Sequence, residues 1–247
     1  MILKDQKIDY KDLINQVNSF SKLLTSQNLS KVAVFSENRF EWVYAFYSVW
    51  IKKAVAVPID FMSSAEDVAF ILNDCKPEVV FYSNGTKEVC EKAIAQLNHK
   101  IEKINLDEIK IEESKVNATF PEPNPKETAV IIYTSGTTGS PKGVMLSYDN
   151  LLVNIEAVTN DVNIYKEEDK VMVLLPLHHI FPLMGTMVIP LSVGGTIVFS
   201  PSMASEDIMA TLQHGITIII GVPRLYNLIR KGIRDKINKS GIAKLLF

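Results

Sequence analysis

The sequence predicts an α/β protein built from two doubly wound, mostly parallel βα layers. Short runs rich in β-branched residues alternate with amphipathic segments of helical periodicity along most of the 247 residues. This alternation stops once, at the proline-rich segment FPEPNPK, and then begins again. Alternate prolines resist both helix and central-strand pairing, so the break predicts two βα series rather than one.

The first series opens with an amphipathic helix, because Leu13, Val17, Phe20 and Leu24 share one helical face behind a possible Asp9 cap. Strands are then predicted at 31–35, 54–59, 78–82 and 101–106. The helices between them are predicted at 41–50, from residue 65 behind a Ser64 cap, and from residue 87. Residues 1–120 form the predicted first α/β subdomain.

Residues 121–127 are the predicted linker, and residues 128–247 form the second α/β subdomain. Its predicted strands are 128–133, 143–146, 170–175, 196–199 and 216–220. Ser147 is positioned to cap a helix, Gly215 to follow one, and Pro223 to begin one. The last residues, 243–247, are apolar and carry no stop signal, so we expect the chain to end inside an element.

Composition excludes several classes of function. With 28 acidic and 26 basic residues the net charge is −2, which does not provide the basic surface that nucleic-acid binding needs. The longest apolar stretches, such as 186–199, are shorter than the roughly 18 residues of a membrane-spanning helix, and the first residues do not form a secretory signal. The only cysteines, Cys75 and Cys90, indicate reduced thiols in a cytoplasmic protein.

The segment most informative about chemistry is Tyr133 to Gly143, YTSGTTGSPKG. Its glycines let backbone N–H groups turn toward an anion, its hydroxyls add donors, and Lys142 adds a positive charge suited to polyphosphate. A Walker A loop has Gly before its Lys and Ser or Thr after it, whereas here Pro141 precedes Lys142 and Gly143 follows. The remaining alternative is a glycine-rich hairpin with a solvated Lys142.

This segment closely resembles the phosphate-loop signature of the AMP-forming adenylating enzymes, which include acyl-CoA synthetases, luciferases and the adenylation domains of peptide synthetases. The segment LPLHHIFPLMG, from Leu175 to Gly185, resembles the family's next motif. Weaker similarity extends over IDYKDLINQV, SENRFEWVYAFYSVW, AVAVPID and GVPRLYNLI, and is strongest to fatty acyl-CoA synthetases. The resemblance implies the fold of the N-terminal domain of acyl-CoA synthetases.

The resemblance also implies a reaction and its site. A carboxylate attacks the α-phosphorus of ATP, pyrophosphate leaves, and the thiol of CoA then displaces AMP from the acyl-adenylate. Thr134 corresponds to the family threonine beside Mg²⁺, a hard cation that prefers oxygen ligands. Lys142 is the implied catalytic cation. The implied nucleotide contacts all lie in one motif: Tyr133, Thr134, Ser135, Gly136, Thr137, Thr138, Gly139, Lys142 and Gly143.

His179 corresponds to the family position that lines the acyl side of the site, and a core histidine is the alternative. His178 is expected to be structural. Amino-acid-activating relatives place an aspartate in this motif, whereas residues 174–187 contain no carboxylate, which favours a fatty acid as substrate. Basic residues between 224 and 239 leave peripheral membrane contact open, although a solvated helix face is the ordinary explanation.

The family's YGxTE-like, RTGD-like and C-terminal lysine motifs do not occur in these 247 residues. We therefore expect an N-terminal fragment of an acid:CoA ligase that is inactive by itself. Two alternatives stay open: a non-catalytic module that binds ATP or acyl groups, and a ligase whose acceptor is an acyl carrier protein.

Overall fold

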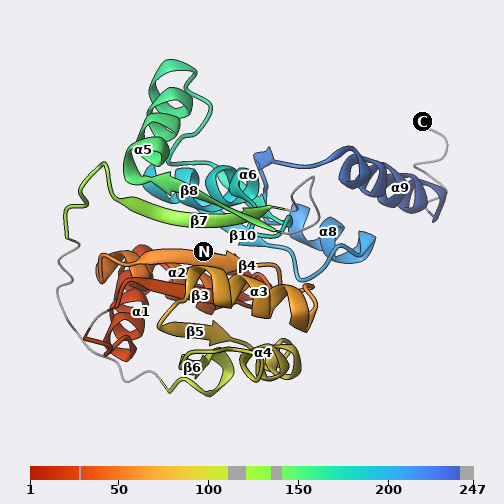
Figure 1. Cartoon of the computed structure of the whole chain (residues 1–247). Helices are drawn as coiled ribbons and strands as arrows, with labels where there is room; N and C mark the ends of the chain where they lie inside the picture. Colours follow the sequence, from red (N-terminus) through yellow and green to blue (C-terminus); the bar gives the residue numbers. More distant parts are fainter. Residues whose placement is uncertain (28, 111–120, 135–140, 240–247) are drawn as a thin grey trace. The chain divides into compact units, whose positions relative to one another are not determined.

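The computed structural model describes residues 1–27, 29–110, 121–134 and 141–239, and it falls into two compact units. The six-stranded unit comprises residues 8–157 and 176–180, and the five-stranded unit comprises residues 1–7, 158–175 and 181–247. Each unit is a β-sheet with its own helices (Figure 1). The predicted ending of the chain inside an element concerns residues that lie outside those described.

Within the described residues, the sheet of the six-stranded unit has the order β6-β5-β3-β4-β7-β8. Its strands from β3 to β7 pair in parallel, and β8 pairs antiparallel with β7. Because β4 lies on one side of β3 and β5 on the other, the winding reverses beside β3, as in doubly wound folds. The strands are β3 Lys31–Phe35, β4 Val55–Ile59, β5 Val79–Tyr82, β6 Glu102–Asn105, β7 Thr128–Thr134 and β8 Lys142–Ser147.

Of the five described helices of this unit, three begin at a cap that the sequence predicts. Asp9 accepts a hydrogen bond from the Asp12 N–H at 2.8 Å, Ser64 caps the next predicted start, and Ser147 forms a capping box with Asn150. Their bounds are α1 Tyr10–Leu23, α2 Phe40–Ile51, α3 Ala65–Cys75, α4 Lys87–Ile94 and α5 Tyr148–Glu156, with a 3₁₀ turn at Leu106–Glu108.

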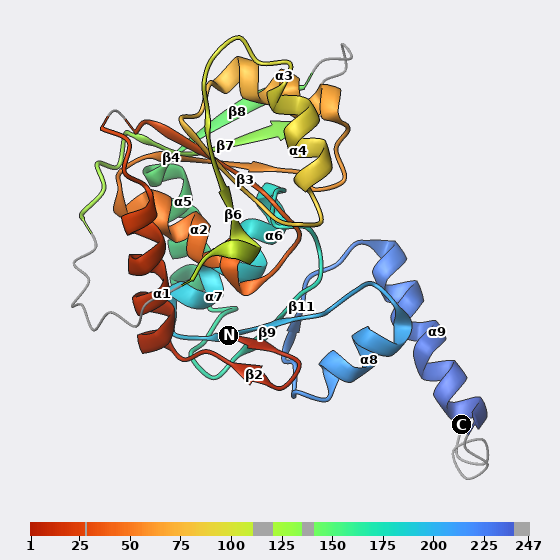
Figure 2. The same ribbon diagram turned by 90° about the horizontal axis from the view of Figure 1, so that it is seen from below.

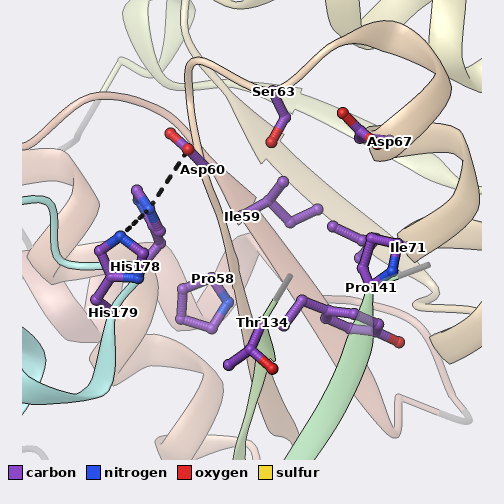
Figure 3. A pocket seen from close by; sticks show the side chains of 11 residues that line it. Pro58, Ile59, Asp60, Ser63, Asp67, Ile71, Thr134, Pro141, His178 and His179 are labelled. Atoms are coloured by element: carbon purple, nitrogen blue, oxygen red, sulfur yellow. Dashed lines mark hydrogen bonds and ion pairs between the residues drawn. The ribbon is translucent and has the colours of Figure 1, made fainter. Parts of the chain in front are cut away.

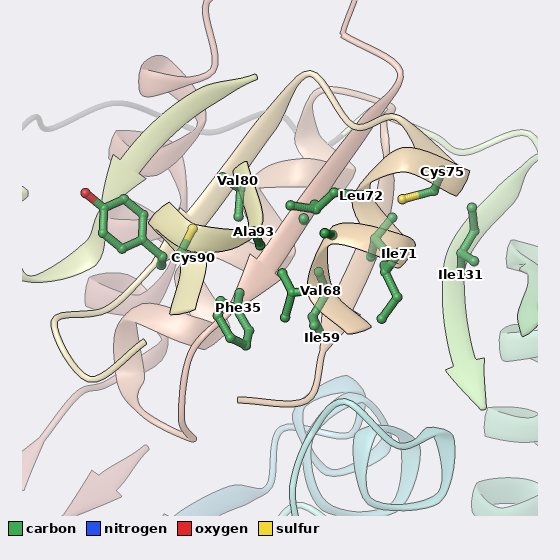
Figure 4. Close-up of a cluster of buried hydrophobic side chains, with 14 residues drawn as sticks. Phe35, Ile59, Val68, Ile71, Leu72, Cys75, Val80, Cys90, Ala93 and Ile131 are labelled. Atoms are coloured by element: carbon green, nitrogen blue, oxygen red, sulfur yellow. The ribbon is translucent and has the colours of Figure 1, made fainter. Parts of the chain in front are cut away.

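Helices cover both faces of this sheet (Figure 2). On one face α3 and α4 pack through a buried cluster that includes Leu72, Cys75 and Cys90 (Figure 4). On the other face Phe20 of α1 contacts Phe81 of β5, with ring centroids 6.0 Å apart. Burial raises the pKa of the Cys75 thiol to about 11 and that of Cys90 to about 12, so both thiols stay protonated and inert at neutral pH.

The five-stranded unit has the sheet order β11-β9-β10-β1-β2 within the described residues. Only the β1–β2 pair is antiparallel. Its strands are β1 Ile2–Leu3, β2 Gln6–Lys7, β9 Lys170–Val173, β10 Thr196–Phe199 and β11 Ile218–Ile219. Its helices are α6 Ile180–Pro182, which begins in the other unit, α7 Ile189–Ser192, α8 Ser205–Leu212 and α9 Pro223–Lys239, with π-helical segments at Ala157–Asp161 and Leu183–Val188.

Two largely parallel sheets confirm the predicted fold class. The structural division differs from the predicted one at 1–120, 121–127 and 128–247. Residues 121–127 contain no helix or strand, but β7 and β8 after them extend the sheet of the first series. The first residues pair instead with β10 of the later series. The boundaries of the two units follow the strand pairing, which crosses the break, and not the position of the prolines.

Candidate functional site

A cavity of about 270 Å³ opens in the six-stranded unit beside the carboxyl ends of β4 and β7. These strands are parallel neighbours, so the residues that follow them meet at one edge of the sheet, where ligands bind in doubly wound folds. Thr134 and Pro141 contribute to one part of the wall, and His178 and His179 to another (Figure 3). The described residues that line the cavity are Pro58, Ile59, Asp60, Ser63, Asp67, Ile71, Tyr133, Thr134, Pro141, His178 and His179.

Tyr133 is held by a hydrogen bond and by the strand next to it. Its hydroxyl donates to Asp74 Oδ2 at 2.5 Å, and burial together with this bond raises the pKa of Tyr133 well above its usual range. Gly143 lies directly opposite on β8. A Cβ atom at Gly143 would lie 3.1 Å from Tyr133 Cζ and 3.0 Å from Ile131 Cγ2. Gly143 thus makes room for the Tyr133 ring, a packing role that the sequence motif did not indicate.

Thr134 and Lys142 are paired residues at the loop end of the β7–β8 hairpin, where β7 ends and β8 begins. Both side chains are exposed, and Thr134 also lines the cavity. The implied phosphate contacts Ser135, Gly136, Thr137, Thr138 and Gly139 lie outside the described residues. The two strands that the loop connects, β7 and β8, are adjacent in the sheet. Both the phosphate-loop interpretation and the hairpin alternative require this.

The two histidines differ in burial although both line the cavity. The His178 side chain is only 7% exposed, whereas His179 is exposed. Their Nε2 atoms are 3.2 Å apart, and His178 Nε2 is 3.6 Å from Asp60 Oδ2. Burial lowers the pKa of His178 to about 4; Asp60 opposes this shift and His179 adds to it. Of the two histidines, the sequence placed only His179 in the site. Asp60 was not predicted to lie there.

A further contact anchors the histidine segment to the sheet. The Leu177 N–H donates to Asn38 Oδ1 at 3.1 Å, and Asn38 lies in the turn after β3. Its neighbour Arg39 forms ion pairs of 2.7 Å with Glu41 and with Asp107, which fix this turn beside β6. Asn38 belongs to the segment SENRFEWVYAFYSVW, whose family resemblance was the only signal for it.

The cavity offers oxygen atoms rather than a preformed metal cage. Within the described ranges, no group of three or more His, Cys, Asp or Glu side chains could hold a metal ion. The Thr134 and Ser63 hydroxyls and the Asp60 and Asp67 carboxylates line the cavity. Hydroxyl and carboxylate oxygens suit a hard cation such as Mg²⁺, which commonly binds through one or two protein oxygens together with substrate phosphates.

In the part of the chain that the structure covers, no helix is both long and apolar enough to span a bilayer.

Curated relatives include ligases for different acids. The chain is 27% identical over 252 residues to a mitochondrial malonate–CoA ligase of Xenopus laevis, covering 92% of this chain and 42% of the relative. It is 31% identical over 173 residues to long-chain-fatty-acid–CoA ligase 1 of Schizosaccharomyces pombe, covering 68% of this chain and 25% of the relative. The chain thus spans less than half the length of these relatives.

Solved structures share the fold. ATP-bound MatB from Rhodopseudomonas palustris superposes with a TM-score of 0.78 at 22% identity, covering 92% of this chain and 47% of that one. The o-succinylbenzoate CoA synthetase of Bacillus subtilis, in complex with its acyl-adenylate intermediate, gives 0.78 at 23% identity, covering 93% and 60%. A family model described as AMP-binding enzyme matches residues 1–245, and the chain therefore belongs to the family of AMP-binding enzymes.

Proposed function

We propose that this chain carries the phosphate-binding part and one wall of the acid pocket of an ATP-dependent ligase that joins a fatty acid to CoA through an acyl-adenylate. The observation that carries the proposal is the cavity at the carboxyl ends of β4 and β7. There Thr134, at one end of the phosphate-loop motif, and His179, in the second motif, line the same space. Thr134 and His179 are 45 residues apart in sequence, and the cavity that they share supports a single site for the two motifs.

In the first half-reaction a carboxylate oxygen attacks the α-phosphorus of ATP, and the bond from that phosphorus to the bridging oxygen of pyrophosphate breaks. Negative charge grows on pyrophosphate as it leaves. Lys142, exposed at the end of β8 beside Thr134, supplies a cation that binds this charge more strongly in the transition state than in the ground state. Mg²⁺, when bound, would neutralise phosphate charge, with the Thr134 hydroxyl and the Asp67 carboxylate as oxygen ligands or partners of its waters.

In the second half-reaction the CoA thiol, after losing its proton, attacks the carbonyl carbon of the acyl-adenylate, and AMP leaves. The acid must therefore be held with its carboxyl group beside the nucleotide phosphates through both steps. His179 is the exposed member of the histidine pair and lines the cavity together with Thr134. Its position supports a role in shaping the acid pocket rather than in contacting the leaving pyrophosphate.

The substrate class rests on the sequence of the second motif. Residues 174–187 contain no carboxylate that could hold the ammonium group of an amino acid. Among the relatives, one is a malonate–CoA ligase and another a long-chain-fatty-acid–CoA ligase, so the family relationship alone does not choose the acid. The apolar character of this motif favours a fatty acid. Both cysteines, Cys75 and Cys90, are free thiols rather than a disulfide, which supports a reducing compartment such as the cytoplasm.

The experiment is acid-dependent exchange of labelled pyrophosphate into ATP, measured in the ligase that contains this chain. Fatty acids of several lengths, malonate and o-succinylbenzoate are compared. Lys103 provides a matched control, because β6 and β8 are the two edge strands of the same sheet and both lysines are exposed. We expect exchange with fatty acids, a loss of about 100-fold in Lys142→Ala, and the wild-type rate in Lys103→Ala.

Adding CoA should then convert the adenylate to a thioester with release of AMP. Three results contradict the proposal: exchange with none of the acids, exchange at the wild-type rate in Lys142→Ala, and adenylate formation without transfer to CoA. ATP binding without exchange would favour a non-catalytic module. Transfer only to an acyl carrier protein would assign the other acceptor.

A further inference from the structure

Asp60, His178 and His179 meet at the cavity wall, with the buried His178 ring between the other two (Figure 3). One nitrogen of His178 faces both neighbours. Its Nε2 atom is 3.2 Å from His179 Nε2, which is hydrogen-bonding distance, and 3.6 Å from Asp60 Oδ2, which is ion-pair distance. A hydrogen bond between two imidazoles requires that one nitrogen carry a proton and that the other present its lone pair.

The carboxylate decides between the two arrangements. If His179 Nε2 were the donor, His178 Nε2 would present a lone pair 3.6 Å from a negative oxygen. Two electron-rich atoms would then face each other beside the buried His178 ring, which is unfavourable. If His178 Nε2 carries the proton, its N–H is attracted by Asp60 and is donated to His179.

We propose that Asp60 and His178 are positioning residues for His179: the Asp60 carboxylate keeps a proton on His178 Nε2, this N–H is donated to His179 Nε2, and His179 is held as the tautomer protonated at Nδ1. In a neutral imidazole the hydrogen bond made by one nitrogen fixes the protonation of the other. The hydrogen bond from His178 thus fixes both the orientation of the His179 ring and the ring nitrogen that acts as donor.

The two anchoring residues are themselves fixed by the backbone. Asp60 Oδ1 accepts from the Met62 N–H at 2.9 Å, which leaves Oδ2 for His178. The histidine segment is held at Leu177 by Asn38. His178 has a pKa lowered to about 4 and so carries a single ring proton at neutral pH, as the arrangement requires. Among the described residues, the other titratable groups that line the cavity are Asp67 and Tyr133.

The consequence for catalysis rests on the proposed function. If His179 shapes the acid pocket, the Nδ1–H tautomer gives that pocket a hydrogen-bond donor at a defined ring position. The tautomer itself does not depend on any reaction. It can be measured in the 247-residue chain without substrate, so failure of this inference and failure of the proposed ligase activity are separate results.

The test is a two-bond ¹H–¹⁵N correlation spectrum of the ¹⁵N-histidine-labelled chain at pH 7, in which protonated and unprotonated ring nitrogens have different shifts. The chain has four histidines, so His178→Gln and His179→Gln assign the pair, while His99 and His214 report whether each unit remains folded. In Asp60→Asn, Oδ1 stays with the Met62 N–H, and the amide nitrogen, a donor, faces His178 Nε2. Asp67→Asn removes the same charge from another place on the cavity wall and is the matched control.

We expect His178 to be protonated at Nε2 and His179 at Nδ1 in the wild-type chain. The major tautomers of both rings should reverse in Asp60→Asn and stay as in wild type in Asp67→Asn. A wild-type His179 protonated at Nε2 would overturn the proposal, and so would wild-type tautomers in a folded Asp60→Asn protein. If Asp60→Asn does not fold, the wild-type tautomers alone decide.

Discussion

Tyr133 on β7 lies directly opposite Gly143 on β8, and its ring occupies the space that a side chain at Gly143 would need. This relationship places the phosphate-loop motif on a hairpin whose first strand is tied by the Tyr133 hydroxyl to Asp74, at the end of α3. The hairpin is thereby held against the six-stranded unit. Gly143, one glycine of the motif, therefore has a packing role in this hairpin.

Replacing Gly143 with alanine should destabilise the six-stranded unit by about 1 to 3 kcal/mol, because the new methyl group would overlap Ile131 and the Tyr133 ring. Gly85→Ala is the control, since a Cβ there meets its neighbours at an ordinary 3.5 Å. Urea denaturation followed by tryptophan fluorescence measures both, because the two tryptophans lie in α2 of this unit. Equal stability of the two variants would show that the ring does not need the glycine.

The stability of the six-stranded unit should fall in acid because of His178. Its folded pKa, about 4, lies below the ordinary value of 6.5, so between these pH values the unfolded chain binds a proton that the folded chain does not. The contribution of His178 to the free energy of unfolding is complete above about pH 6.5. It is lost as the pH falls toward 4, by up to about 1.4 kcal/mol per pH unit. Urea denaturation of wild type and His178→Gln at several pH values measures the difference.

The difference in unfolding free energy between wild type and His178→Gln should shrink as the pH is lowered from 6.5 to 4. Ser63→Ala, a neutral change in the same cavity, should keep the wild-type pH dependence. A difference that does not vary with pH would mean that His178 is protonated as easily in the folded state as in the unfolded state.

The sequence predicted the parts of the fold that depend on local pattern. Strands 31–35 and 196–199 have the predicted bounds, and Asp9, Ser64 and Ser147 cap the helices they were expected to cap. The pairing of β1 with β10 was missed, and the antiparallel β7–β8 hairpin was foreseen only in the alternative interpretation of the glycine-rich loop. Pairing partners far apart in sequence leave no local periodicity, and a parallel and an antiparallel strand can carry the same apolar pattern.

For the site, the sequence indicated residues whose motif resembles a known family, among them Thr134, Lys142 and His179. It did not indicate Asp60 or Asn38, and it assigned His178 to the structure alone. The positions of Asp60 and Asn38 follow from the topology, because each lies just after a parallel strand, at the sheet edge where the histidine segment is anchored. A single Asp or Asn after a strand has many ordinary explanations in a sequence read alone.

In the ligase that we propose, replacing His179 with alanine should change which acids are preferred, because a cavity-lining side chain is removed. We expect the ratio of kcat/KM between long and short acids to change about tenfold, which is the size of effect that small changes in an apolar pocket produce. His99→Ala, outside the cavity, is the control. A substrate profile identical to wild type would place His179 in a purely structural role.

The most direct test of the account is whether this chain holds the phosphates of ATP through Lys142. In a ³¹P NMR titration of Mg·ATP with the 247-residue chain, we predict that the β- and γ-phosphorus signals shift more than the α signal, with a Kd on the order of millimolar. Lys142→Ala should raise this Kd about tenfold, equivalent to about 1.4 kcal/mol, and Lys103→Ala should leave it unchanged. Phosphorus signals that the chain does not shift, or a Kd for Lys142→Ala equal to that of wild type, would contradict the account.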